Sequence, residues 1–109
     1  MIVGEATEQY SVSDAYLAAF RGYLRIATDR LDGEIKDLIC AAMDDLILGA
    51  VLPVRAIDES DPLLKKAIAT YIKAEFGLDN DNAEQYRAAY GDLKKRFLLS
   101  DRYTKVEEE

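Results

Sequence analysis

The stretch DPLLKKAIATYIKAEFG, residues 61–77, decides the fold. Asp61 is suited to cap the free amide groups of a first helical turn. Pro62 follows at a position where a helix needs no amide donor. Gly77 can take the left-handed backbone conformation that commonly closes a helix. The stretch therefore predicts a helix over residues 61–77.

The apolar side of this predicted helix is unusually wide. At about 100° per residue, its apolar side chains cover roughly half of the circumference. These side chains are Leu63, Leu64, Ala67, Ile68, Tyr71, Ile72 and Ala74. A helix that buries half of its surface needs more than one neighbour. We therefore expect it to be the central helix of a small bundle.

Two further helices are predicted before the central one. Ser13 is suited to cap the first, which covers about residues 13–26. The second covers about residues 33–49, and either Thr28 or Asp32 can cap it. Each carries an apolar stripe at helical spacing, which usually packs into a core. The stripes are Tyr16, Phe20, Tyr23 and Leu24 in the first helix, and Ile35, Leu38, Ile39, Ala42, Met43, Leu46 and Ile47 in the second.

The last predicted helix covers about residues 81–99. Asp81 at the cap and Glu84 three residues later match a capping box. A calcium loop starting at Asp79 is excluded, because Glu84 stands where the loop needs glycine and Tyr90 where it needs glutamate. The helix is rich in basic residues, which either form a solvated face or contact an acidic partner, including another copy of this chain.

Three segments depart from helical spacing. Residues 49–60, GAVLPVRAIDES, predict a longer loop, extended or one arm of a small hairpin. This loop either folds back over the core or offers a contact surface. Residues 101–109, DRYTKVEEE, predict a flexible acidic tail that has no core to join and orders only on a partner. Residues 1–10 are expected to be ordered only if Ile2 and Val3 are held in place. The expected fold is thus all-α, with one domain over residues 1–109.

Composition limits the possible functions. The chain has 109 residues, a net charge of −7 and an estimated pI of 4.6. An acidic chain gains nothing from phosphate contacts, so direct nucleic-acid binding is disfavoured. One cysteine cannot form an internal disulfide, which fits a reducing compartment. No apolar run reaches the roughly 18 residues of a membrane span, and the first residues do not resemble a signal peptide. A cytosolic product is therefore expected.

The usual catalytic and metal-binding patterns are absent from the sequence. There is no histidine, which excludes a Cys–His nucleophile at Cys40 and the usual zinc sites. Cys40 is expected to be a small packing residue. No glycine-rich phosphate-binding loop is present. Asp44 and Asp45 are adjacent on a helix and point about 100° apart, so they cannot act as an aspartic dyad. We expect neither an enzyme nor a bound cofactor or metal.

The order of these signals resembles a known family. Leu24–Ile26 end a short helix, the polar turn TDRLDGE follows at residues 28–34, and LICAAMDDLI occupies residues 38–47. The loop then leads to the central stretch, and DNDNAEQYRAAYGDLKKRFLLSDRY covers residues 79–103. Over residues 11–103 the chain resembles the small head-tail connector, or DNA-packaging, proteins of tailed phages and prophages.

The resemblance implies a structural protein of the virion neck with no reaction to catalyse. Such subunits form a ring, dodecamer-like in the virion, beneath the portal of a DNA-filled head. The implied partners are other copies of the chain, the portal protein, and the stopper or another neck or tail protein. DNA passes through the channel without specific binding, and no membrane or cofactor is involved. The implied locations are the head-tail junction of the virion and, during assembly, the host cytoplasm.

A ring needs two different, complementary surfaces on each subunit. We expect acidic residues of the second helix to face basic residues of the last two helices on the neighbouring copy. The predicted residues are Asp37, Asp44 and Asp45 on one side, and Lys94, Lys95 and Arg96 on the other. The loop and the tail are expected to contact portal and stopper. Their predicted contact residues are Val51, Leu52, Val54, Arg102 and Tyr103.

Two other functions fit an acidic helical chain. One is a protein–protein interaction module, either a regulatory binder or a DNA mimic that occupies the site of a basic protein. It predicts a monomer or dimer with acid clustered on one face, whereas here the acid is spread among caps, turns and tail. The other is a helical enzyme or chaperone-like subunit. The missing site chemistry speaks against an enzyme, and a chaperone would need an exposed apolar groove, whereas each helix here has one stripe to bury.

Overall fold

The computed structural model describes residues 10–76 and 81–106, which form six helices and no strand. The helices are α1 (Asp14–Leu24), α2 (Asp32–Leu48), α3 (Pro53–Ala56), α4 (Pro62–Glu75), α5 (Ala83–Leu98) and α6 (Asp101–Thr104). The all-α class and the four longer helices expected from the sequence are confirmed. The two short helices, α3 and α6, lie in segments that the sequence predicts to be non-helical.

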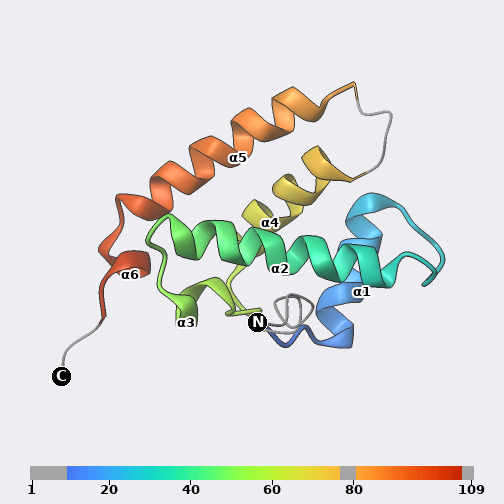
Figure 1. Cartoon of the computed structure of the whole chain (residues 1–109), viewed down its shortest axis with the longest axis horizontal. Helices are drawn as coiled ribbons and strands as arrows, with labels where there is room; N and C mark the ends of the chain where they lie inside the picture. Colours follow the sequence, from blue (N-terminus) through green and yellow to red (C-terminus); the bar gives the residue numbers. More distant parts are fainter. Residues whose placement is uncertain (1–9, 77–80, 107–109) are drawn as a thin grey trace, which may run out of the picture.

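Helix α4 is the centre of the bundle, as predicted. It contacts α1, α2 and α5, and Figure 1 shows it between α2 and α5. Its buried residues are Leu64, Ala67, Ile68, Ile72 and Ala74. Asp61 caps the helix, because its carboxylate accepts hydrogen bonds from the amides of Leu63 and Leu64 at 2.9 and 3.3 Å. Leu63 is the exception within the predicted apolar side, since its side chain is exposed.

The sequence signals how helix α1 begins but not how it ends. The hydroxyl of Ser13 accepts a hydrogen bond from the amide of Tyr16 at 3.1 Å, which confirms the predicted cap. The helix ends because Arg25 adopts the left-handed conformation, with φ of 59°. Tyr16 and Phe20 are buried and pack edge to face. The core role predicted for the aromatic stripe is therefore confirmed for Tyr16 and Phe20, whereas Tyr23 of the same stripe is exposed.

Helix α2 starts without either of its predicted caps. Leu31 occupies the N-cap position, the hydroxyl of Thr28 accepts a hydrogen bond from Arg30 instead, and Asp32 lies inside the first turn. At the other end, Gly49 leaves room for a side chain of α5. A Cβ on Gly49 would lie 2.8 Å from Cε of Lys94, which is closer than packed carbon atoms approach. Gly49 therefore lets the Lys94 side chain lie against the end of α2.

Helix α5 begins at Ala83 with Asn82 at the N-cap position, so the predicted capping box at Asp81 and Glu84 is wrong. Several other predictions fall outside the described residues. These are the helix-closing role of Gly77, the start of the excluded calcium loop at Asp79, the N-terminal residues 1–9 and the tail residues 107–109.

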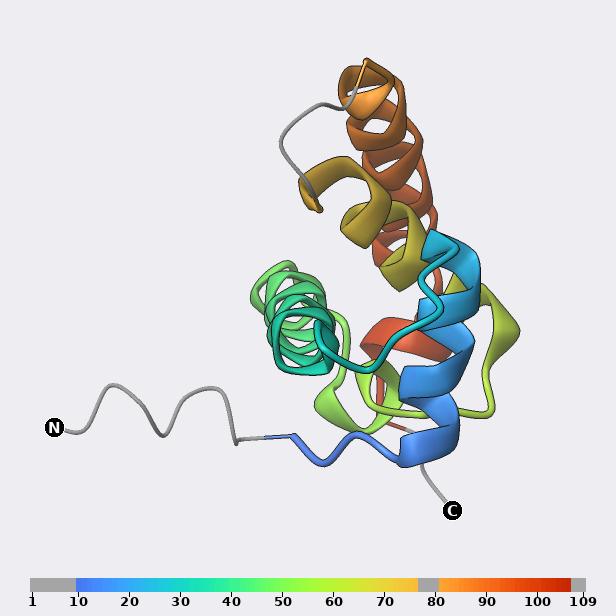
Figure 2. The same cartoon turned by 90° about the vertical axis from the view of Figure 1, so that its right-hand side faces the viewer.

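A single cluster of buried side chains draws on all six helices. Figure 2 views the bundle along α2, with the α4–α5 pair above it and α1 on the opposite side of the molecule. The segment over residues 49–60 also joins this core, because Val51 and Ala56 are fully buried. This segment was expected either to fold back over the core or to offer a contact surface. Val51 and Ala56 fold back over the core, and the segment forms one helical turn, α3, instead of an extended arm.

Candidate functional site

The C-terminal segment is docked onto the bundle by Tyr103. The side chain of Tyr103 is 4% exposed and its ring packs on that of Phe97, with 4.7 Å between centroids. Its carbonyl accepts a hydrogen bond from the amide of Leu52 at 2.8 Å. The predicted free tail is thus wrong for residues 101–104. Tyr103 is a large apolar ring with one polar atom, and the core supplies partners for both parts.

The hydroxyl of Tyr103 reaches the residue that starts α4. It donates a hydrogen bond of 2.9 Å to Oδ2 of Asp61, whose side chain is also buried. Asp61 therefore caps α4 with one oxygen and holds α6 with the other, while the guanidinium of Arg102 lies 3.9 Å from Oδ2. Burial, followed by the bond to Asp61, raises the pKa of Tyr103, so the phenol stays neutral and keeps donating.

A groove lies where α3 meets the end of the C-terminal segment. It has a volume of about 600 Å³ and is lined by Leu52, Pro53, Val54, Arg55, Lys105 and Val106. Val54 is 68% exposed and Val106 is 74% exposed. The hydrogen bond from Leu52 to Tyr103 holds the two walls together. The groove is thus apolar in its lining and basic at its edge.

More apolar surface lies at this end of the molecule. Leu48 closes α2 and Leu99 follows α5, and the two side chains are 87% and 86% exposed. Figure 1 shows α2 and α5 ending on the same side, next to α3 and α6. We call this region the α3–α6 end and define it by Leu48, Val54, Leu99 and Val106. Large apolar side chains exposed together are typical of a surface that contacts another protein.

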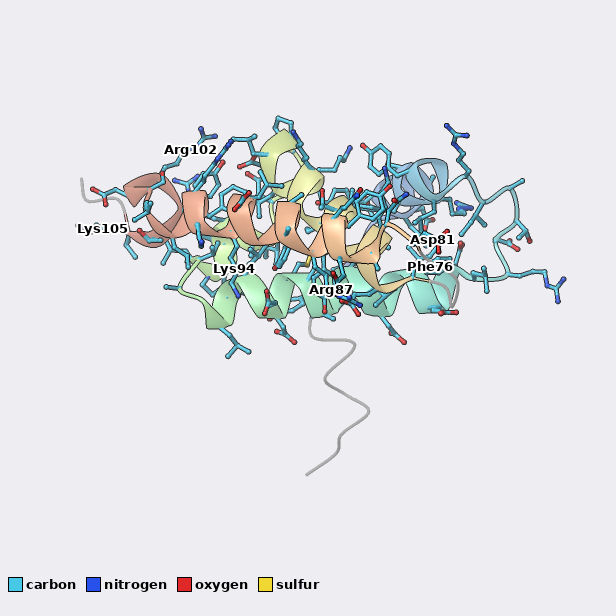
Figure 3. The ribbon with its side chains drawn as sticks, turned by 90° about the horizontal axis from the view of Figure 1, so that it is seen from above. Phe76, Asp81, Arg87, Lys94, Arg102 and Lys105 are labelled. Atoms are coloured by element: carbon cyan, nitrogen blue, oxygen red, sulfur yellow. The ribbon has the colours of Figure 1, made fainter. Side chains whose placement is uncertain are left out.

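Basic side chains surround the apolar residues of the α3–α6 end. Figure 3 shows Arg102 and Lys105 beside α6, at the opposite end of α5 from Asp81. Arg96 lines a second, smaller groove of about 280 Å³ together with Phe97 and Tyr103. Lys95 is exposed on the last turns of α5. Positive charge is therefore concentrated here although the chain as a whole is acidic.

Two of the residues predicted for a contact between subunits bind each other within the chain. Nζ of Lys94 lies 3.0 Å from Oδ2 of Asp45, and the hydroxyl of Tyr90 donates to the same oxygen at 2.6 Å. Burial by itself raises the pKa of Asp45, but the bonds from Tyr90 and Lys94 outweigh it and leave this pKa below its ordinary value. Asp45 and Lys94 thus belong to the packing of α2 on α5.

The remaining predicted contact residues separate into three groups. Leu52, Val54, Arg102 and Tyr103 come together at the α3–α6 end, as do Lys95 and Arg96, whereas Val51 is buried in the core. Asp37 is exposed on α2. Asp44 is partly exposed and accepts a hydrogen bond from the hydroxyl of Tyr10. The structure therefore joins the loop and tail residues, whereas among the predicted acidic and basic residues it joins Asp45 and Lys94.

Sequence reasoning missed four residues of the α3–α6 end. Leu48, Leu99, Lys105 and Val106 were assigned to helix ends or to a free tail, where single apolar residues carry no periodic signal. One local signal was available, because Ser100 followed by Asp101 is a common way to begin a helix. It would have suggested α6 and, with it, a docked Tyr103.

Cofactor and membrane sites can be assessed only for the part of the chain that the structure describes. There, no group of three or more acidic or cysteine side chains is placed to hold a metal ion. In the same residues, no helix is long and apolar enough to cross a membrane. Cys40 is buried on α2, and burial raises the pKa of its thiol, which makes it a poor nucleophile.

Comparison with known proteins gives one match. A family model for phage connector proteins matches residues 17–104, from within α1 to the last residue of α6. No curated protein and no solved structure matches. The matched segment includes α6, which agrees with its place in the core. Because the match spans well over half of the sequence, this chain belongs to the phage connector protein family, whose members are structural rather than enzymatic parts of the phage particle.

Proposed function

We propose that the chain is a neck protein that forms a closed ring beneath the portal of a tailed phage or prophage. The ring connects the DNA-filled head to the stopper or another tail protein and extends the DNA channel. It acts at the head-tail junction of the virion, after assembly in the host cytoplasm. The whole chain, residues 1–109, works as a single domain without a cofactor.

The α3–α6 end carries this proposal. Val54, Leu99 and Val106 are exposed on it, and the adjoining side chains of Arg102 and Lys105 are basic. Apolar residues ringed by charge are the usual composition of a protein interface, with the apolar part at its centre. The α3–α6 end is therefore the surface we assign to the contact with portal or stopper.

The charge of the chain supports a channel role. A channel wall built from chains of net charge −7 is not expected to gain counterion-release energy from phosphates. DNA can then slide past it, whereas a basic wall would retain the DNA. Concentrating cations at the α3–α6 end keeps them in a protein contact and away from the channel.

The proposal is tested by native mass spectrometry of the chain with the portal protein of the same genome. We expect a stoichiometric complex with wild type and at least a tenfold weaker complex with the double variant Val54→Ser/Val106→Ser. Leu31→Ser is the matched control, since Leu31 is an exposed apolar residue at the opposite end of α2. Equal binding of all three chains would overturn the assignment of this surface.

A further inference from the structure

Charge is distributed unevenly over the helices of this acidic chain. Helices α4 and α5 contain seven Lys or Arg and three Asp or Glu, whereas α2 contains five acids and one lysine. The molecule therefore has a basic part and an acidic part. Complementary surfaces of this kind favour and orient a contact between proteins.

The basic part contains a groove. It lies where α1 meets α4, has a volume of about 500 Å³, and is lined by Tyr23 of α1 and by all three lysines of α4, Lys65, Lys66 and Lys73. Nζ of Lys65 lies 5.6 Å from the centroid of the Tyr16 ring, and Nζ of Lys73 lies 5.9 Å from that of Tyr86. The two rings orient these lysines through cation–π contacts.

Lys66 is the most accessible of the three lysines. Its side chain is exposed, and within the described residues no carboxylate lies within ion-pair distance of it. Tyr23, on the opposite wall, is also exposed. The groove thus offers positive charge beside an apolar ring, which suits a partner segment that combines carboxylates with apolar side chains.

The exposed side of α2 has that composition. Glu34, Asp37, Ala41, Asp44 and Leu48 recur every three or four residues and so share one face of the helix. Glu34, Asp37 and Leu48 are exposed, while Ala41 and Asp44 are partly exposed. We call this face the α2 stripe. It combines three acids with an exposed leucine.

The spacing of charges in the groove matches that of the α2 stripe. Lys66 and Lys73 are seven residues apart on α4, and Asp37 and Asp44 are seven residues apart on α2. Both pairs span two turns, a rise of about 10 Å, and stay on one face of their helix. Two helices with these spacings, lying side by side, can therefore place each of the two acids opposite one of the two lysines.

We infer that the α2 stripe of one copy docks in the lysine groove of the next copy. The inference rests on the proposed ring and names the surfaces that build it. Figure 2 shows α2 on one side of the molecule and α1, which forms one wall of the groove, on the other. Because the two surfaces differ, each subunit uses one toward each neighbour, which is the head-to-tail contact that a ring requires.

Charge-swapped variants of the full chain test this contact under conditions where wild type forms the ring. Lys66→Glu/Lys73→Glu and Asp37→Lys/Asp44→Lys are each expected to lose at least tenfold in assembly, because like charges then face each other. An equimolar mixture of the two variants should assemble again, as should a chain with all four reversals. Arg30→Glu/Lys36→Glu is the control, with two reversals of the same sign outside both surfaces and outside the α3–α6 end. Circular dichroism confirms that each variant is folded.

The outcomes separate the contact from the ring. If every charge-reversed variant still forms the same ring as wild type, the contact is overturned and the proposed function stands. Loss of assembly without recovery in the mixture would show that the two surfaces do not meet, which also overturns the inference. A wild-type chain that forms no oligomer, alone or with portal, would instead overturn the ring itself.

Discussion

The hydrogen bond between Tyr103 and Asp61 joins α6 to the start of α4, so its loss should lower stability. Tyr103→Phe removes a donor from a buried carboxylate, and we expect a loss of about 1.5–3 kcal/mol in the free energy of unfolding. Tyr16→Phe is the control, because the buried hydroxyl of Tyr16 has no hydrogen-bond partner among the described residues. Chemical denaturation measures both, and equal losses would contradict the role of Asp61.

The ion pair of Asp45 and Lys94 gives a pH-dependent contribution at the same scale. The pKa of Asp45 in the folded chain is below its ordinary value of 3.8. Its contribution is therefore complete above that value and disappears as the pH falls through the folded-state pKa. Lys94→Gln should cost about 0.5–1 kcal/mol at neutral pH, as expected for a partly exposed pair.

The cost of Lys94→Gln should shrink toward zero below the folded-state pKa of Asp45, where wild type has also lost the pair. Denaturation curves at several pH values measure this difference. Lys95→Gln, at an exposed neighbouring position, should show no such pH dependence. A cost of Lys94→Gln that stayed constant down to the acid limit would mean that Asp45 is not the partner.

Single residues differ in how far their roles can be predicted. Ser13 and Asp61 act within three residues of their own position, so the sequence reveals them as caps. The second role of Asp61, as acceptor for a tyrosine 42 positions later, depends on how the helices pack. Asp45 and Lys94 were predicted to form a contact between subunits. Complementary charges alone do not show whether two residues meet within one chain or between two copies.

At the scale of elements, α6 and the α3 segment are expected to stabilise each other. Truncation after Leu99 removes α6 and leaves Asp61 and the amide of Leu52 without their Tyr103 partners. Tyr103→Ala in the full chain should already cost about 2–4 kcal/mol, as for other large buried side chains. Hydrogen exchange of the Leu52 amide should accelerate in both variants. Unchanged exchange in the truncated chain would show that α3 is ordered independently of α6.

A helix could be predicted from the sequence where its own residues carry a cap, a proline at the start or a periodic apolar pattern. Helix α4 has a cap, a proline at its first position and an apolar side of several turns, and each signal indicates the same helix. Helices α3 and α6 have four residues each, too few to show a periodic pattern. Their position comes from burying Ala56 and Tyr103 in a core made by the other helices. The loop and tail were therefore expected as contact segments, but the surface that they build together could not be foreseen.

At the scale of the whole molecule, different parts of one small bundle serve different contacts, and Leu48 at the end of α2 belongs to both the α3–α6 end and the α2 stripe. The α3–α6 end is assigned to portal or stopper, and the lysine groove and the α2 stripe are assigned to neighbouring copies. The family could be predicted because its characteristic order of turns and helices extends over most of the sequence. The family match confirms this prediction. The contact surfaces are not periodic features and needed the folded chain.

Assembly of the chain into a closed ring on the portal can be measured by native mass spectrometry across concentration. The chain is measured alone and with the portal of the same genome. We expect a closed oligomer, or a complex in which the copies of this chain match the portal subunits in number. A monomer or dimer that ignores the portal at every concentration would contradict it and point to an acidic protein that binds another partner.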